Sequence, residues 1–61
     1  MPVIEIKWYE GRSREQKEEI ARQITKTMVE VGKMTPEHVW IVFENVPRSE
    51  WSIGGKLQDK T

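Results

Sequence analysis

The sequence predicts an α+β fold in which a β-α-β unit is followed by a C-terminal hairpin. Apolar and polar residues alternate over residues 3–10, and apolar residues recur at helical spacing over residues 14–31. A continuous apolar run at residues 39–43 is typical of a second strand, and Gly54-Gly55 mark a late turn. A helical crossover between two strands makes them parallel and is right-handed in nearly all known cases.

The first strand has one apolar face and one charged face, as expected for a half-buried strand. Ile4, Ile6 and Trp8 lie on the apolar face, and Glu5 and Lys7 lie on the charged face. Gly11 ends this segment, and Ser13 followed by Gln16 is a capping-box pattern. The Ser13 hydroxyl can accept a backbone N–H of the first turn while Gln16 reaches back, so a helix is expected to begin at Arg14.

The predicted helix carries one apolar stripe that is expected to pack on the sheet. The stripe consists of Ile20, Ala21, Ile24, Met28 and Val31. Val29 falls on the opposite side, where it is either a tolerated exposed valine or a contact in an assembly. Gly32 is expected to form the left-handed C-cap, and residues 35–37 are expected to cap and begin a single short turn.

The second strand and the tail differ in character. The run VWIVF at residues 39–43 is rich in β-branched and aromatic side chains, which predicts a central strand covered on both faces. The tail contains a proline, then an aromatic residue, then two glycines. This order predicts a loop followed by a small hairpin or an edge strand that can pair with another subunit.

The chain is too short to bury a large core of its own. Its 61 residues suit one domain, residues 1–61, and a chain of about 60 residues buries only roughly 60% of its unfolded surface. Hydrophobic residues make up 36% of the sequence and cysteine is absent, so neither disulfides nor a thiolate zinc site can add stability. We therefore expect self-association.

Charge and hydropathy argue against several classes of partner. Lys plus Arg and Asp plus Glu each number 10, so the formal net charge is zero and nothing indicates a nucleic-acid or anionic-membrane partner. No apolar run approaches the roughly 20 residues of a transmembrane helix, and the N-terminus lacks the basic and apolar regions of a signal peptide. We expect a cytoplasmic protein that holds any charged ligand by local groups.

The inventory of catalytic side chains is small. His38 is the single histidine, and no metalloprotease, nucleophile-elbow or phosphate-loop motif occurs. Met1-Pro2 is more informative, because methionine before a small residue is normally removed and would leave a free secondary amine. An α-amino group has an ordinary pKa of about 7.7–8.0, which desolvation or nearby cations lower, so a neutral proline can serve as a general base. The alternative is that Pro2 only begins an edge strand.

Four segments of the chain together resemble one known family. Pro2 opening a strand, EGRS at residues 10–13, REQK at residues 14–17 and WSIGG at residues 51–55 resemble the 4-oxalocrotonate tautomerase family in order and spacing. The resemblance spans nearly the whole chain. It implies the β-α-β unit and hairpin already expected, assembled as dimers of which three usually form a hexamer. It also implies a cofactor-free enzyme acting on a small-molecule carboxylate.

The resemblance implies roles for three residues. Pro2 would be the general base that converts a dienol or enol acid, such as 2-hydroxymuconate, to a conjugated ketone. Arg12 would bind a substrate carboxylate, often from a neighbouring subunit, and an arginine fork at a helix N-terminus is a reasonable anion site in its own right. Trp51 matches an aromatic residue that walls the active site. The alternatives are a solvated Arg12 and a Trp51 that anchors a subunit interface.

The sequence departs from the family at Trp40. The family has a second arginine at this position, which polarises the substrate carbonyl, whereas tryptophan offers one neutral donor. Losing such a donor typically costs about 10² to 10³ in rate. The candidates to replace this arginine are Arg48 and His38, which is expected on the same strand face as Trp40. Alternatively, Trp40 fills the pocket and favours a smaller or less charged substrate.

Two further functions stay open from the sequence. The family includes hydratase-like dehalogenases of haloacrylates, in which a carboxylate activates water, and Glu50 or Glu44 are the available carboxylates. A binding or structural oligomer with a weakened site is the other alternative, because the carbonyl-side arginine is missing.

Overall fold

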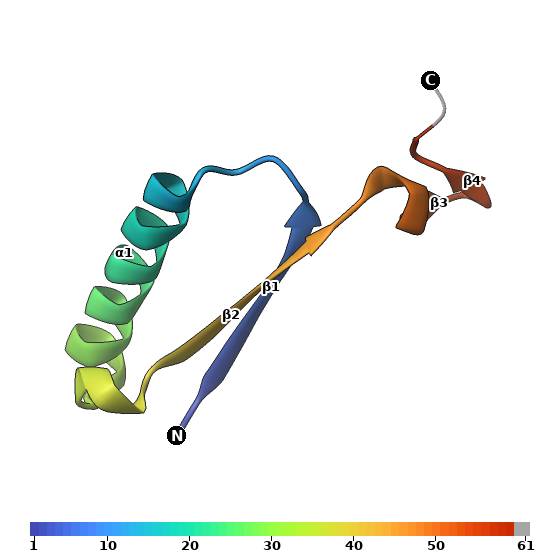
Figure 1. The fold of residues 1–61 in the computed structure, drawn as a ribbon. Helices are drawn as coiled ribbons and strands as arrows, with labels where there is room; N and C mark the ends of the chain where they lie inside the picture. The colour runs from blue at the N-terminus through green and yellow to red at the C-terminus, as the bar shows by residue number, and fades with distance from the viewer. Residues whose placement is uncertain (60–61) are drawn as a thin grey trace.

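A pair of parallel strands lies beside the long helix, and a small hairpin lies beyond one end of the pair (Figure 1). The computed structural model describes residues 1–59. Its elements are β1 (Val3–Tyr9), α1 (Arg14–Gly32), the short 3₁₀ helix η1 (Pro36–His38), β2 (Trp40–Val46), the 3₁₀ helix η2 (Arg48–Glu50), β3 (Ser52–Ile53) and β4 (Lys56–Leu57). The predicted β-α-β unit with a C-terminal hairpin is therefore confirmed, including the parallel pairing of β1 and β2.

The register of β1 and β2 sorts their side chains onto two faces. Ile4 pairs with Ile41, Ile6 with Phe43 and Trp8 with Asn45 on the face toward α1. Val3 pairs with Trp40, Glu5 with Val42, Lys7 with Glu44 and Tyr9 with Val46 on the other face. We call this the open face, because Val3, Trp40 and Val42 on it are about half exposed within residues 1–59. The apolar face predicted for the first strand is thus the face that packs toward the helix.

The start of α1 follows from the local sequence. The Gln16 backbone N–H donates to Ser13 Oγ at 3.2 Å, and the Ser13 N–H donates to Gln16 Oε1 at 2.9 Å. These two bonds satisfy orphan donors of the first turn reciprocally, so the predicted capping box is confirmed. The short turn expected after the helix is also present, as η1 with Pro36 at its first position.

The end of α1 corrects one prediction. Gly32 is the last helical residue, and Lys33 takes the left-handed conformation, with φ 56°. A Cβ at Gly32 would lie 2.9 Å from Cε of Met34, the flexible end of a side chain that can move aside. The C-cap prediction placed the left-handed residue one position too early.

The apolar stripe of α1 is shorter than predicted. Ile20, Ala21, Ile24 and Met28 are half-buried, whereas Val31 is 76% exposed. The 19 residues of α1 span about 28 Å, and the seven residues of β1 span about 23 Å. The last turn of the helix therefore extends past the sheet. Val29, predicted to lie off the stripe, is half-buried.

No side chain in residues 1–59 is fully buried within a single copy of this chain. The Cα radius of gyration is 14.7 Å, against about 10 Å for a compact chain of this length. The second strand is longer than predicted. Within residues 1–59 of one copy, β2 pairs with β1 alone and leaves Trp40 and Val42 about half exposed, so the predicted coverage of both faces is not provided by one copy. One copy alone has no core comparable to that of a stable domain.

We predict that folding of this chain depends on protein concentration. Burial of the open sheet face against other copies would add the missing apolar contact, so the melting temperature should rise as the concentration increases over a hundred-fold range. Circular dichroism melts at each concentration, with sedimentation velocity on the same samples, measure this directly. A melting temperature independent of concentration, for a species that sediments as a monomer, would contradict it.

Candidate active site

Pro2 lies at the amino end of the strand pair, where its position is fixed by backbone pairing. Its carbonyl oxygen accepts the Trp40 backbone N–H at 3.2 Å, one residue before the paired strands begin. Pro2 is half-buried, whereas Met1 before it is 74% exposed. The nitrogen of Pro2 is therefore held at a defined place beside the start of β2.

Trp40 is the residue whose backbone N–H reaches Pro2. It opens β2 opposite Val3 and is 52% exposed on the open face of the sheet. Its indole Nε1–H donates to the Glu37 carbonyl oxygen at 3.3 Å, so the single polar group of the ring already has a partner within the chain. What Trp40 offers beside Pro2 is apolar aromatic surface.

His38 does not lie on the strand face of Trp40, contrary to the sequence-based expectation. The His38 backbone N–H donates to the Thr35 carbonyl oxygen at 3.0 Å, which closes the η1 turn before β2 begins. The strand alternation that placed His38 and Trp40 on one face does not extend into this turn.

Arg12 lies at the other end of β1, in the loop that leads into α1. Its guanidinium carbon is 4.9 Å from the ring centroid of Trp8. The Trp8 indole in turn stacks on Phe43, with centroids 5.4 Å apart, and donates its Nε1–H to Asn45 Oδ1 at 2.7 Å. Arg12 thus stands on an aromatic surface supported by two residues of β2.

Arg48 and Trp51 also gather at this end, around a residue that the sequence reasoning missed. The Arg48 guanidinium carbon is 4.1 Å from the Tyr9 ring centroid, and the Trp51 ring centroid is 4.7 Å from the same Tyr9 centroid. The sequence does contain a signal for two aromatic clusters, because consecutive residues of a strand, here Trp8 and Tyr9, point to opposite faces. Arg12 and Arg48 are therefore associated with opposite faces of the sheet.

The predicted site residues form two groups that one chain does not join. Pro2 and Trp40 lie at the amino end of the sheet, and Arg12, Arg48 and Trp51 lie at its carboxyl end. The seven residues of β1 separate the two ends by about 23 Å. A small acid cannot contact Pro2 and Arg12 of the same copy, and Arg48 of the same copy cannot act beside Trp40.

The two carboxylates considered for water activation also lie away from Pro2. Glu44 is opposite Lys7 on the open face, four residues along β2 from Trp40 and hence about 13 Å away. Glu50 closes η2, its backbone N–H donating to the Pro47 carbonyl oxygen at 2.8 Å. Neither carboxylate accompanies the proline within one chain.

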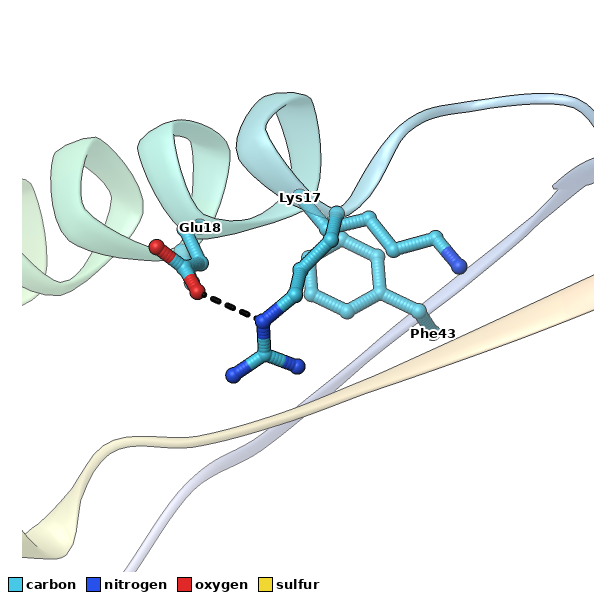
Figure 2. A pocket seen from close by; sticks show the side chains of 5 residues that line it. Lys17, Glu18 and Phe43 are labelled. Atoms are coloured by element: carbon cyan, nitrogen blue, oxygen red, sulfur yellow. Dashed lines mark ion pairs between the residues drawn. The ribbon is translucent and has the colours of Figure 1, made fainter.

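A separate hollow of about 350 Å³ lies between the first turns of α1 and β2, and Figure 2 shows Lys17 and Phe43 within it. Arg14, Glu18 and Ala21 complete its lining. Arg14 Nε is 2.9 Å from Glu18 Oε1, an ion pair on an exposed helix face. The hollow is on the helix side of the sheet, whereas Trp40 beside Pro2 is on the open side.

The strongest electrostatic effect in the described chain is also remote from Pro2. Hydrogen bonds from Arg22 and Gln23 lower the pKa of Glu19 to about 2, on the exposed surface of α1. In residues 1–59 no cluster of three or more His, Asp or Glu side chains is arranged to hold a metal ion. Over the same residues, α1 is too polar to cross a membrane.

Comparison with known proteins shows that the chain is similar to tautomerases. Residues 2–60 match the sequence model of the tautomerase enzymes. A probable tautomerase of Ralstonia nicotianae is 32% identical over 57 residues, which cover 93% of this chain and 88% of the relative. A probable tautomerase of Streptococcus agalactiae is 33% identical over 60 residues, covering 98% of this chain and all of the relative.

Solved structures give the same answer for the fold. The crystal structure of a 4-oxalocrotonate tautomerase homologue superposes with a TM-score of 0.93 at 30% identity, covering 100% of this chain and 97% of the other. A heterohexamer 4-oxalocrotonate tautomerase from Chloroflexus aurantiacus superposes with a TM-score of 0.85 at 30% identity, covering 98% and 97%. The α+β fold expected from the sequence resemblance is confirmed by both.

Proposed function

The chain belongs to the tautomerase family, and on that basis we propose that it converts a 2-hydroxydienoate or related enol acid to the conjugated ketone. Pro2 is the general base in this proposal, after removal of Met1. The observation that carries it is the placement of Pro2, half-buried at the amino end of β1 and held by its hydrogen bond from the Trp40 backbone N–H. An amine in a fixed, partly desolvated position is a suitable proton shuttle.

The reaction needs only one proton carrier. The neutral amine of Pro2 accepts the proton of the enol hydroxyl, and the electron pair of that O–H bond becomes the second bond of the carbonyl. The displaced diene electrons then take the proton back from the prolinium at a carbon atom. The substrate is isomerised, the amine is regenerated, and no other reactant is consumed.

The complete site requires more than one copy of the chain. Because about 23 Å separates Pro2 from Arg12 along β1, the carboxylate-binding arginine beside Pro2 must come from another subunit. The open sheet face and the absence of buried side chains in residues 1–59 support an obligate assembly. We propose that the chain forms dimers that assemble into a hexamer, and the heterohexamer tautomerase from Chloroflexus aurantiacus supports a six-subunit assembly.

The other site residues have distinct roles in this proposal. Arg12 binds the substrate carboxylate through its two-pronged guanidinium, and Trp51 excludes water as part of the pocket wall. Arg48, stacked on Tyr9, is the cation available to polarise the substrate carbonyl from a neighbouring copy. Trp40 provides an apolar wall beside Pro2, which favours substrates whose far end carries no second charge.

We predict that Pro2→Ala lowers kcat by at least about 10², because an alanine amine is a weaker and less rigidly placed general base. In the native protein, kcat/KM should rise with pH as the amine loses its proton. Turnover of 2-hydroxymuconate and phenylenolpyruvate, followed by absorbance, checks both, and intact mass establishes that Met1 is absent.

Two results would contradict the role of Pro2. Undiminished turnover by Pro2→Ala would remove the proline from the mechanism, and so would full activity of a protein that retains Met1. If the native protein turns over the enol acids no faster than Pro2→Ala does, a binding or structural oligomer is favoured instead. Chloride release from 3-haloacrylates would favour the dehalogenase.

We predict that Trp40→Arg shifts substrate preference from a phenyl-substituted enol monoacid toward the dicarboxylate 2-hydroxymuconate. A placed cationic donor is worth about 10² to 10³ in rate, so the ratio of the two kcat/KM values should change at least ten-fold. Trp40→Phe is the matched control, since it keeps an apolar ring and should leave the ratio nearly unchanged. Equal ratios for the native protein and Trp40→Arg would show that Trp40 does not face the substrate.

A further inference from the structure

The backbone on both sides of Arg12 is fixed by local structure. Gly11 before it has φ 125°, a conformation that residues with a Cβ rarely adopt. Ser13 after it is held by the two hydrogen bonds of the capping box with Gln16. Arg12 therefore lies in a loop whose backbone conformation is fixed on both sides of it.

The side chain of Arg12 is also held, by an aromatic ring with supports of its own. Its guanidinium carbon lies 4.9 Å from the Trp8 ring centroid. Trp8 cannot turn freely, because its Nε1–H donates to Asn45 Oδ1 at 2.7 Å and its ring stacks on Phe43 at 5.4 Å. Asn45 pairs with Trp8 in the β1–β2 register, so the support belongs to the sheet.

Arg12 has no acidic partner within residues 1–59, whereas two arginines of α1 each have one. Arg14 pairs with Glu18 at 2.9 Å, and Arg22 pairs with Glu19. Within residues 1–59, the carboxylates form no ion pair with Arg12. The positive charge is fixed in place and is not neutralised by its own chain.

From this arrangement we propose that Trp8 is a positioning residue for Arg12, and that the Trp8–Asn45 hydrogen bond sets the direction in which Arg12 presents its N–H groups to a substrate carboxylate. The proposal rests on the carboxylate-binding role given to Arg12 above. A guanidinium that stacks on an indole keeps its in-plane N–H donors available, so stacking and bidentate binding of a carboxylate are compatible. Holding the arginine beforehand lowers the entropy lost when the carboxylate binds.

The test uses the assembled protein and two probes, the enol acid substrate and adipate, a saturated dicarboxylate that cannot be tautomerised. Trp8→Leu should raise KM for the enol acid and Kd for adipate about three- to five-fold, with kcat within about two-fold of native. Asn45→Leu keeps a side chain of similar size but removes the acceptor, and should raise both constants about two-fold. Trp8→Phe keeps an aromatic face but removes the N–H donor, so it should raise both constants about two-fold, as Asn45→Leu does.

A double-mutant cycle separates positioning from general stability. If Trp8 acts through Arg12, Trp8→Leu raises Kd for adipate in the native background and has no further effect in Arg12→Ala. In proton NMR spectra, the side-chain resonances of Arg12 should move downfield when Trp8→Leu removes the ring current of the indole. Equal effects of Trp8→Leu with and without Arg12, or unchanged Arg12 resonances, would overturn the proposal.

Two provisions keep the result decisive. If Trp8→Leu does not assemble, the cycle is run with Asn45→Leu, where additivity with Arg12→Ala again overturns the proposal. If the native protein turns over no enol acid, the proposed function fails while the adipate cycle still tests the link between Trp8 and Arg12. Native turnover with an uncoupled cycle would reject the positioning role alone.

Discussion

The parallel pairing of β1 with β2 is the constraint on which the rest of the structure depends. A parallel pair puts both amino ends at one edge and both carboxyl ends at the other. The hydrogen bond from Trp40 to the Pro2 carbonyl marks the first edge, and the one from Glu10 to the Val46 carbonyl, at 3.2 Å, marks the second. The candidate base and the candidate anion-binding residues are thereby held at opposite ends of a rigid unit.

This separation links the stability of the protein to its chemistry. A chain whose open sheet face exposes Val3, Trp40 and Val42 gains burial by associating with other copies. The same association is the only way in which the amino end of one sheet can meet the carboxyl end of another. Folding, assembly and construction of the proposed site are therefore one process.

Local patterns allowed the sequence to predict most of the fold. The capping box at Ser13 and Gln16 and the alternation in β1 each depend on residues within one element, and both are confirmed. Val31 was misjudged because helical periodicity does not report where the sheet ends. The helix continues through Gly32 and turns left-handed at Lys33, one residue later than the glycine indicates, and the extent of coverage of β2 depends on other chains.

The candidate site was harder to predict because its contacts cross the fold. The resemblance points to Pro2, Arg12 and Trp51. The alternation of Trp8 and Tyr9 puts these two rings on opposite faces, but it does not indicate that Arg12 lies over Trp8 or that Tyr9 contacts both Arg48 and Trp51. These contacts arise from the strand register. The departure at Trp40 was visible in the sequence, but only the structure shows that its indole N–H is already bound to the Glu37 carbonyl.

Mixing two inactive variants tests most directly whether the base and the carboxylate-binding arginine come from different copies. Pro2→Ala and Arg12→Ala would be unfolded together, reassembled, and assayed at substrate concentrations well below KM. In a random equimolar mixture about one quarter of the sites should contain both native groups, so activity should exceed that of either variant reassembled alone. Activity equal to the mean of the separately reassembled variants would contradict a site shared between subunits.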